Sequence, residues 1–221
     1  MGRGMTPEQL KSIQRKLRDG FPEDMSLRVH RAISWLQRAA AEKDDHDVAF
    51  ILLWVAFNAC YADDEGGFSS SRERDKSKVW FEKALRLDDE AMVHDAVWTK
   101  FNGPIRKLLG NPYVFQPYWN DRNGIPGYEN WQDSFDGAKV VAKRSLDSQN
   151  TATLLSIVFN RLNVLRNQLI HGGATWNSQV NREQVKEGRM ILAFLLPCFI
   201  EIMMNNPHED WGKPFYPVVG L

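Results

Sequence analysis

The chain has 221 residues, of which 43% are hydrophobic and 25% charged, and its 28 lysines and arginines are balanced by 28 aspartates and glutamates. This length allows a substantial core in one large domain or two small ones, and the composition is ordinary for a soluble globular protein. A zero net charge argues against a protein that coats nucleic acid non-specifically, because such proteins are usually strongly basic. Any contact with RNA must therefore come from a local patch.

The N-terminal part of the chain predicts three successive helices. The first begins at Pro7 after the N-cap Thr6 and stops at Gly20. The second, over about 23–42, has apolar residues at helical spacing. The third, over about 46–62, is apolar nearly all round, as expected for a helix at the centre of a bundle.

The rest of the chain predicts further helices around an irregular insertion. We expect a flexible polar loop over 63–75, helical segments over 77–101, and helices at about 150–171 and 181–204. Between them, residues 102–132 are dense in glycine, proline, asparagine and aromatic residues, so they cannot form a continuous helix and are too aromatic for a disordered linker. We predict an ordered insertion packed on the bundle. Its aromatic residues more often serve packing than base stacking, which is the alternative.

These elements predict the all-α class, with one helical domain over residues 1–221. The most apolar stretch, 190–200, is shorter than the roughly 20 residues of a membrane span and contains Pro197, so we expect no contact with a membrane. Cys60 and Cys198 lie in apolar runs, where a free thiol behaves as a small hydrophobe. This usage predicts a reducing, cytoplasmic location and no disulfide.

The predicted helix 150–171 carries a polar stripe. At about 100° per residue, Asn160, Asn163, Asn167 and His171 fall within an arc of roughly 80°. Burying such groups without partners is costly, and a solvated helix face usually carries a mixture of glutamate, lysine and arginine instead. The stripe therefore indicates a lined groove or an interface with a second copy.

Arg166 does not share this stripe, since it lies about 140° from His171 on an ideal helix. The two side chains can converge if the helix end is distorted, if the long arginine reaches around, or if a second copy faces the first. Gly172 and Gly173 permit the first arrangement, because glycine adopts the left-handed conformations that end helices. The residues alone leave a functional site and a structural helix end equally well supported.

The segment 166–171, RNQLIH, resembles the signature of the HEPN superfamily, in which an arginine, usually followed by a polar residue, precedes a histidine by four to six intervening positions. The apolar segment 51–62, the tail 171–188 and the last apolar helix extend the resemblance to the Apea-like branch, but the insertion 102–132 does not. The resemblance implies a HEPN-like bundle that pairs as a homodimer, with the two motif helices meeting at a cleft. It also implies RNA cleavage without a metal or other cofactor.

This chemistry agrees with the residue types of the motif. RNA carries its own nucleophile, the 2′-hydroxyl, so no metal-activated water is needed. His171 would act as general acid or base, and Arg166 would stabilise negative charge on a phosphate oxygen. Asn167 would hydrogen-bond the phosphate or hold a histidine in its working tautomer.

Four further residues are candidates for lining the same cleft as substrate-binding groups: Asn58, Asn160, Asn163 and Trp176. Asn58 is polar within the most apolar helix, and satisfaction of a backbone carbonyl is its favoured alternative role. Trp176 follows the two glycines and would form a wall of the cleft. The acidic turn 44–47 predicts no metal site, because consecutive side chains fan out and acidic residues are favoured at a helix start.

Together these features predict a cytoplasmic, metal-independent endoribonuclease that forms 2′,3′-cyclic phosphates as a homodimer. We expect a toxin or defence effector restrained by an inhibitory or antitoxin partner. The main alternative is a non-catalytic HEPN module that dimerises and binds RNA, a nucleotide or a protein. A structural bundle with an accidental motif is a third.

Overall fold

The computed structural model describes residues 4–62, 71–214 and 216–217, and these residues form helices joined by turns, with no strand among them. The predicted all-α class is confirmed. Within the same residues, no helix combines the length and the apolarity needed to cross a bilayer.

The three N-terminal helices form where the sequence predicts them. Helix α1 (Pro7–Leu17) begins with a capping box, in which the Gln9 amide donates to Thr6 Oγ1 at 3.3 Å and the Thr6 amide donates to Gln9 Oε1 at 2.8 Å. A 3₁₀ turn, Arg18–Gly20, follows it. Helix α2 (Glu23–Ala41) and helix α3 (His46–Tyr61) then pack against each other.

Helix α4 (Ser71–Arg86) begins earlier than the sequence suggested. The prediction of a loop up to residue 75 is wrong from Ser71 onward, while residues 63–70 lie outside the described residues. The first turns of α4 contain no apolar side chain that could reveal a helical period. Arginine, glutamate and lysine nevertheless favour helix by intrinsic propensity, which explains the longer element.

The segment after α4 consists of short pieces, although its first part, 87–101, contains no glycine or proline and was predicted to be helical. Helix α5 (Met92–Asp95) runs into a π-helical turn, and it is followed by α6 (Asn102–Gly110) and α7 (Gln116–Arg122). The insertion therefore contains two short α-helices and a 3₁₀ turn, Pro112–Val114, and is less irregular than expected. Its aromatic rings pack mainly on one another, with the Tyr118 ring centred 4.9 Å from that of Trp131.

Three long helices complete the chain. Helix α8 (Trp131–Asp147) was not predicted, because only Phe135, Ala142 and Ser145 of its residues are buried and the apolar period is weak. Helix α9 (Thr151–Ile170) and helix α10 (Arg182–Asn205) confirm the two predicted C-terminal helices.

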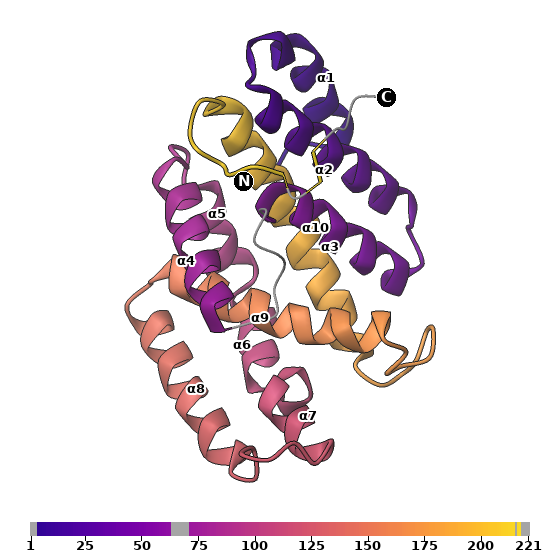
Figure 1. Cartoon of the computed structure of the whole chain (residues 1–221), viewed down its shortest axis with the longest axis vertical. Helices are drawn as coiled ribbons and strands as arrows, with labels where there is room; N and C mark the ends of the chain where they lie inside the picture. Colours follow the sequence, from indigo (N-terminus) through magenta and orange to yellow (C-terminus); the bar gives the residue numbers. More distant parts are fainter. Residues whose placement is uncertain (1–3, 63–70, 215, 218–221) are drawn as a thin grey trace.

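Helix α9 crosses the middle of the molecule (Figure 1). Helices α1, α2, α3 and α10 gather at one end, while α6, α7 and α8 form the other. Aromatic rings from four helices meet in the core, where Phe57 of α3, Phe81 of α4 and Phe199 of α10 surround Phe159 of α9 at centroid distances of 4.4, 4.9 and 6.4 Å. The core thus fixes α9 relative to α3.

Helix α3 is covered by other helices on most of its circumference. Trp54 and Phe57 are buried, but Val48, Ile51 and Val55 on the outer flank remain half-exposed. Both cysteines are buried and free, and burial raises the pKa of Cys60 and of Cys198 to about 12. The thiols are therefore packing groups, as predicted.

Candidate functional site

The end of α9 places His171 at the surface. Gly172 has a φ of +70°, its amide donates to the Leu169 carbonyl at 3.4 Å, and the Gly173 amide donates to the Gln168 carbonyl at 2.7 Å. This is the Schellman arrangement, which ends a helix with a left-handed glycine. A Cβ on Gly173 would lie 3.1 Å from the Gln168 carbonyl oxygen. Both glycines therefore have a structural role, and the helix ends just after it has exposed the His171 side chain.

Arg166 occupies an unusual position for a charged side chain. It is half-buried, its guanidinium carbon lies 5.6 Å from the centre of the Trp54 ring, and its Nη1 donates to Asn167 Oδ1 at 2.7 Å. Burial lowers the pKa of Arg166. Among the described residues, no carboxylate lies within ion-pair distance of this guanidinium, and its Nε has no hydrogen-bond partner. A desolvated cation without a counter-charge is a ready site for an external anion.

The hydrogen bond from Arg166 to Asn167 turns the guanidinium toward the polar stripe. Asn167 and His171 are four residues apart and share one face of the helix. Helix α9 remains α-helical through Ile170, so a distorted helix end does not bring Arg166 and His171 together. No hydrogen bond joins these two side chains in the described part of the chain. The long arginine thus reaches the edge of the stripe without closing the gap to the histidine.

The three remaining asparagines of the predicted site are all half-buried. Asn160 and Asn163 are half-buried on the stripe of α9. Asn58 is also half-buried and lies one helical turn after Trp54, on the same side of α3. Its side chain makes no hydrogen bond within the described residues, so the alternative role of satisfying a backbone carbonyl finds no support.

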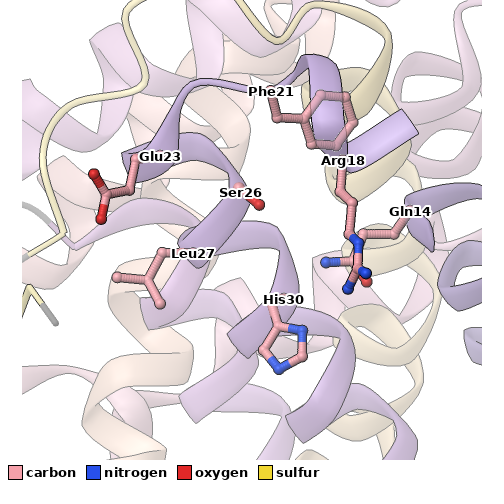
Figure 2. A pocket seen from close by; sticks show the side chains of 7 residues that line it. All are labelled: Gln14, Arg18, Phe21, Glu23, Ser26, Leu27 and His30. Carbon is pink, nitrogen blue, oxygen red and sulfur yellow. The ribbon is translucent and has the colours of Figure 1, made fainter. Parts of the chain in front are cut away.

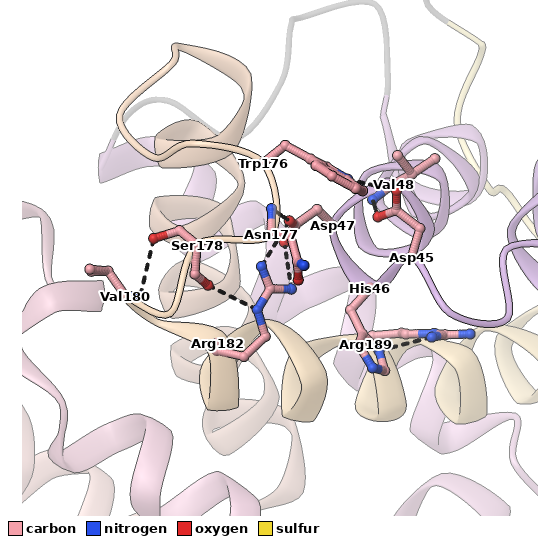
Figure 3. A network of polar contacts seen from close by, with 10 residues as sticks. All are labelled: Asp45, His46, Asp47, Val48, Trp176, Asn177, Ser178, Val180, Arg182 and Arg189. Atoms are coloured by element: carbon pink, nitrogen blue, oxygen red, sulfur yellow. Dashed lines mark hydrogen bonds and ion pairs between the residues drawn. The ribbon is translucent and has the colours of Figure 1, made fainter.

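Trp176 lies apart from Arg166. Its side chain is 72% exposed, and its indole N–H donates to Asp45 Oδ2 at 2.8 Å, at the start of α3 (Figure 3). Asp45 precedes Trp54 by nine residues, or about 13 Å along a helix. Of the predicted site residues, the structure brings together Arg166, Asn167 and the flank of α3 that carries Asn58, with Trp176 at a distance.

Sequence reasoning missed the buried ion pair that fixes the loop after His171 (Figure 3). Arg182 donates from Nη1 and Nη2 to the two carboxylate oxygens of Asp47 at 3.0 and 2.9 Å. The same arginine donates from Nε to the Ser178 carbonyl at 2.9 Å, and the Asn177 amide donates to Asp47 at 2.7 Å. We call Asp47, Arg182, Asn177 and Ser178 the loop clamp.

One local signal indicates that Arg182 needs a carboxylate partner, although it does not identify which one. Arg182 is the first residue of α10, where the positive end of the helix dipole disfavours a cation, so a carboxylate partner was to be expected. The acidic turn before α3 supplies it. Asp45 serves as the N-cap, since the Val48 amide donates to its Oδ1 at 2.9 Å. The next acidic residue, Asp47, is instead buried as part of the clamp.

Gln168 connects α9 with the loop after His171 and with the insertion. Its Oε1 accepts from Asn181 Nδ2 at 2.8 Å, and its Nε2 donates to the Tyr113 carbonyl at 2.6 Å. The loop after His171 is thus held by the clamp in its middle and by Gln168 near its end. The insertion is attached to α9 at the same point.

No group of three or more His, Cys, Asp or Glu side chains suited to a metal ion occurs within the described ranges. No family model, curated protein or solved structure matches the chain. The function must therefore be argued from the residues of the site.

Proposed function

We propose that this protein is a metal-independent endoribonuclease whose reactive residues are Arg166, Asn167 and His171. The observation that carries the proposal is the state of Arg166: half-buried, desolvated and without a carboxylate among the described residues, although it lies beside a histidine-bearing helix end. A phosphate group would supply the missing counter-charge.

Each of the three residues has a distinct part in the proposed reaction. The 2′-oxygen of RNA attacks the adjacent phosphorus, a 2′,3′-cyclic phosphate forms, and the bond to the 5′-oxygen breaks. His171 removes the proton from the 2′-hydroxyl or donates one to the leaving 5′-oxygen. Arg166 stabilises the charge that develops on the phosphate oxygens, and Asn167 holds the guanidinium in position through their 2.7 Å hydrogen bond.

The separation of Arg166 and His171 within one chain supports a homodimer with a composite site. In such a dimer, the arginine of one copy would meet the histidine of the other. Two surfaces suit this pairing: the half-buried asparagine stripe of α9, and the outer flank of α3 with Val48, Ile51 and Val55. A half-exposed apolar flank beside a polar stripe is the composition of an interface core with its rim.

The biological role in this proposal is that of a toxin or defence effector in the cytoplasm. A free ribonuclease of this kind would damage the RNA of its own cell, so we propose that an inhibitory or antitoxin partner restrains it.

A non-catalytic module that dimerises and binds RNA, a nucleotide or a protein is the second candidate. It is favoured by the side chain of His171, which is exposed and has no hydrogen-bond partner among the described residues. Catalytic histidines are commonly oriented by a second group. In the ribonuclease proposal, the second copy or the RNA supplies that group.

Cleavage of labelled single-stranded RNA in EDTA tests the proposal. We expect wild-type protein to leave 2′,3′-cyclic phosphate ends, and His171→Ala and Arg166→Ala each to lower the rate by about 100-fold or more. His208→Ala, which removes another exposed histidine, is the matched control and should cleave like wild type. A His171→Ala protein that cleaves at the wild-type rate would refute the mechanism. Specific binding without cleavage would favour the second candidate.

Mixing the two inactive variants tests the composite site. Co-refolded Arg166→Ala and His171→Ala chains form mixed dimers, in which one of the two sites keeps both an intact arginine and an intact histidine. Random pairing would then restore about a quarter of the wild-type activity. If the site lies within one chain, no activity returns.

A further inference from the structure

A pocket of about 360 Å³ lies between α1 and α2, on elements that carry none of the proposed reactive residues. Figure 2 shows the side chains that line it. Helix α1 and the turn after it contribute Gln14, Arg18 and Phe21, whereas α2 contributes Glu23, Ser26, Leu27 and His30.

The wall formed by α1 and His30 concentrates positive charge. Lys11 Nζ lies 3.1 Å from His30 Nδ1 and donates to Gln14 Oε1 at 2.9 Å, so both of its contacts are with uncharged acceptors. Arg15, one helical turn after Lys11 in α1, and Arg18, the first residue of the turn that follows α1, add further positive charge near Lys11. Within the described chain, no carboxylate lies within ion-pair distance of Lys11 or His30.

The protonation state of His30 follows from this surrounding. Burial, then the charges of Lys11 and Arg18, lower the pKa of His30 below its ordinary value. Its Nδ1 accepts from the Lys11 ammonium, which leaves Nε2 as an N–H donor.

The same wall of the pocket is rich in unused donors. Gln14 is only 2% exposed, and because its Oε1 is engaged by Lys11, its amide nitrogen remains as a donor with no acceptor among the described residues. The Ser26 hydroxyl likewise makes no hydrogen bond to any described residue. Arg18 adds a guanidinium whose Nε forms an exposed ion pair with Asp19 Oδ1 at 3.7 Å.

Acidic and apolar groups occupy other parts of the lining. Glu23 is the acidic residue of the lining, and it stands across the pocket from Arg18 and Gln14 (Figure 2). Phe21, near Arg18, and Leu27, on the side of Glu23, supply the apolar surface of the lining (Figure 2). The pocket thus combines a donor-rich cationic wall with apolar side chains.

We propose that this pocket binds the phosphomonoester group of a small ligand, with the phosphate against Arg18, Gln14 and His30 and the organic part against Phe21 and Leu27. A phosphate dianion offers only acceptor oxygens in a tetrahedral arrangement, which matches donors that arrive from two helices. A planar carboxylate offers fewer acceptor sites and would leave donors unpaired. The proposal is independent of RNA cleavage by Arg166 and His171.

The imidazole NMR signal of His30 reports binding directly, and the His30→Gln variant assigns it. Phenyl phosphate is the probe, and inorganic phosphate, benzoate and benzyl alcohol are the comparison compounds. We expect a saturable shift with phenyl phosphate, weaker binding of inorganic phosphate and none of benzyl alcohol. The bound dianion should raise the pKa of His30, because a nearby negative charge favours the imidazolium.

Two variants and a matched control separate a defined site from general attraction. Lys11→Met and Arg18→Met should each weaken phenyl phosphate binding about tenfold, the loss of one charge-assisted hydrogen bond or close charge. Lys16→Met removes the same charge from α1 outside the pocket lining and should leave the affinity unchanged.

Four results would overturn the proposal. The first is the absence of a saturable shift at millimolar phenyl phosphate. The second is a Lys16→Met variant that weakens binding as much as Lys11→Met and Arg18→Met do. The third is benzoate binding as tight as that of phenyl phosphate, and the fourth is binding only of an end-blocked oligonucleotide, which carries phosphodiesters. Because the readout is binding at His30, a failure here leaves the cleavage assay unaffected, and the reverse also holds.

Discussion

Arg166 and Arg182, which lie close to the loop after His171, have opposite surroundings in the folded chain. Arg182 of the loop clamp is 10% exposed and meets a carboxylate through two hydrogen bonds and a carbonyl through a third. Arg166, half-buried on the motif helix, has a neighbouring amide and the face of Trp54 as partners. A third arginine, Arg28, behaves like Arg182: it is 1% exposed and donates to the backbone carbonyls of Gly212, Lys213, Ala59 and Cys60.

The difference separates buried charge that internal contacts explain from buried charge that they do not explain. Arg28 and Arg182 are explained by the contacts they make inside the chain, which satisfy their donors. Arg166 is not, because its Nε has no partner among the described residues and its burial lowers its pKa. A charged group that folding buries at a free-energy cost, without a counter-charge inside the described chain, is suited to bind an anion outside the chain.

The largest expected effect is the loss of the clamp. Asp47→Ala leaves Arg182 buried without a counter-charge, which should lower the free energy of unfolding by about 3–5 kcal/mol. Urea denaturation measures the change, and Asp44→Ala, which removes an exposed carboxylate from the same turn, should cost less than about 0.5 kcal/mol. Replacing both partners, Asp47→Leu with Arg182→Met, should recover most of the loss, because no charge remains buried. If Asp47→Ala is as stable as Asp44→Ala, the loop clamp does not contribute to the free energy of unfolding.

The corresponding change at Arg166 should affect stability far less. Arg166→Met keeps the apolar stem against Trp54 and removes a desolvated charge, so we expect the free energy of unfolding to change by no more than about 1 kcal/mol, with a gain as the favoured direction. The same denaturation experiment measures it. A loss of about 3 kcal/mol would assign Arg166 to the structural group with Arg182, and the cleavage proposal would then lose its main support.

The helix end around His171 and the loop clamp also differ in how far the sequence predicts them. The helix end around His171 follows from local patterns: a polar stripe, an arginine and two glycines within one short segment. The loop clamp joins Asp47 and Arg182, which lie 135 residues apart, and no local pattern pairs them. The same limit applies to α8, whose few buried residues give a weak period, and to the start of α4, where helix propensity acts without apolar spacing. Local signals thus predicted most helices and the motif, while the placement of Trp176 by Asp45 required the folded chain.

A smaller effect is expected from the glycine that ends the motif helix. Gly172 and Gly124 have φ angles of +70° and +67° with no atom close to the position of a Cβ, so alanine at either site should cost about 1 kcal/mol through backbone strain. Under the proposed function, only Gly172→Ala should also slow RNA cleavage, because it alters the backbone next to His171. Thermal denaturation and the cleavage assay together test the pair. Equal cleavage by both variants would show that the position of His171 tolerates a change in the helix end.

The smallest effect concerns the pH dependence of the clamp region. Burial, followed by the charges of Arg189, Lys186 and Arg182, lowers the pKa of His46, although Asp47 acts in the opposite direction. The unfolded chain therefore takes up the proton first as the pH falls, and stability should decrease from about pH 6.5 downward, through the lowered pKa of the folded state. The contact of Arg189 Nη1 with His46 Nδ1 at 2.8 Å requires the neutral ring, so protonation also removes a hydrogen bond that holds the start of α3 to α10. Urea titrations of wild type and His46→Gln at pH 7.5 and pH 5.5 isolate this contribution, since His30 is common to both proteins. A variant that loses as much stability as wild type over this interval would show that His46 does not couple protonation to the packing of the clamp.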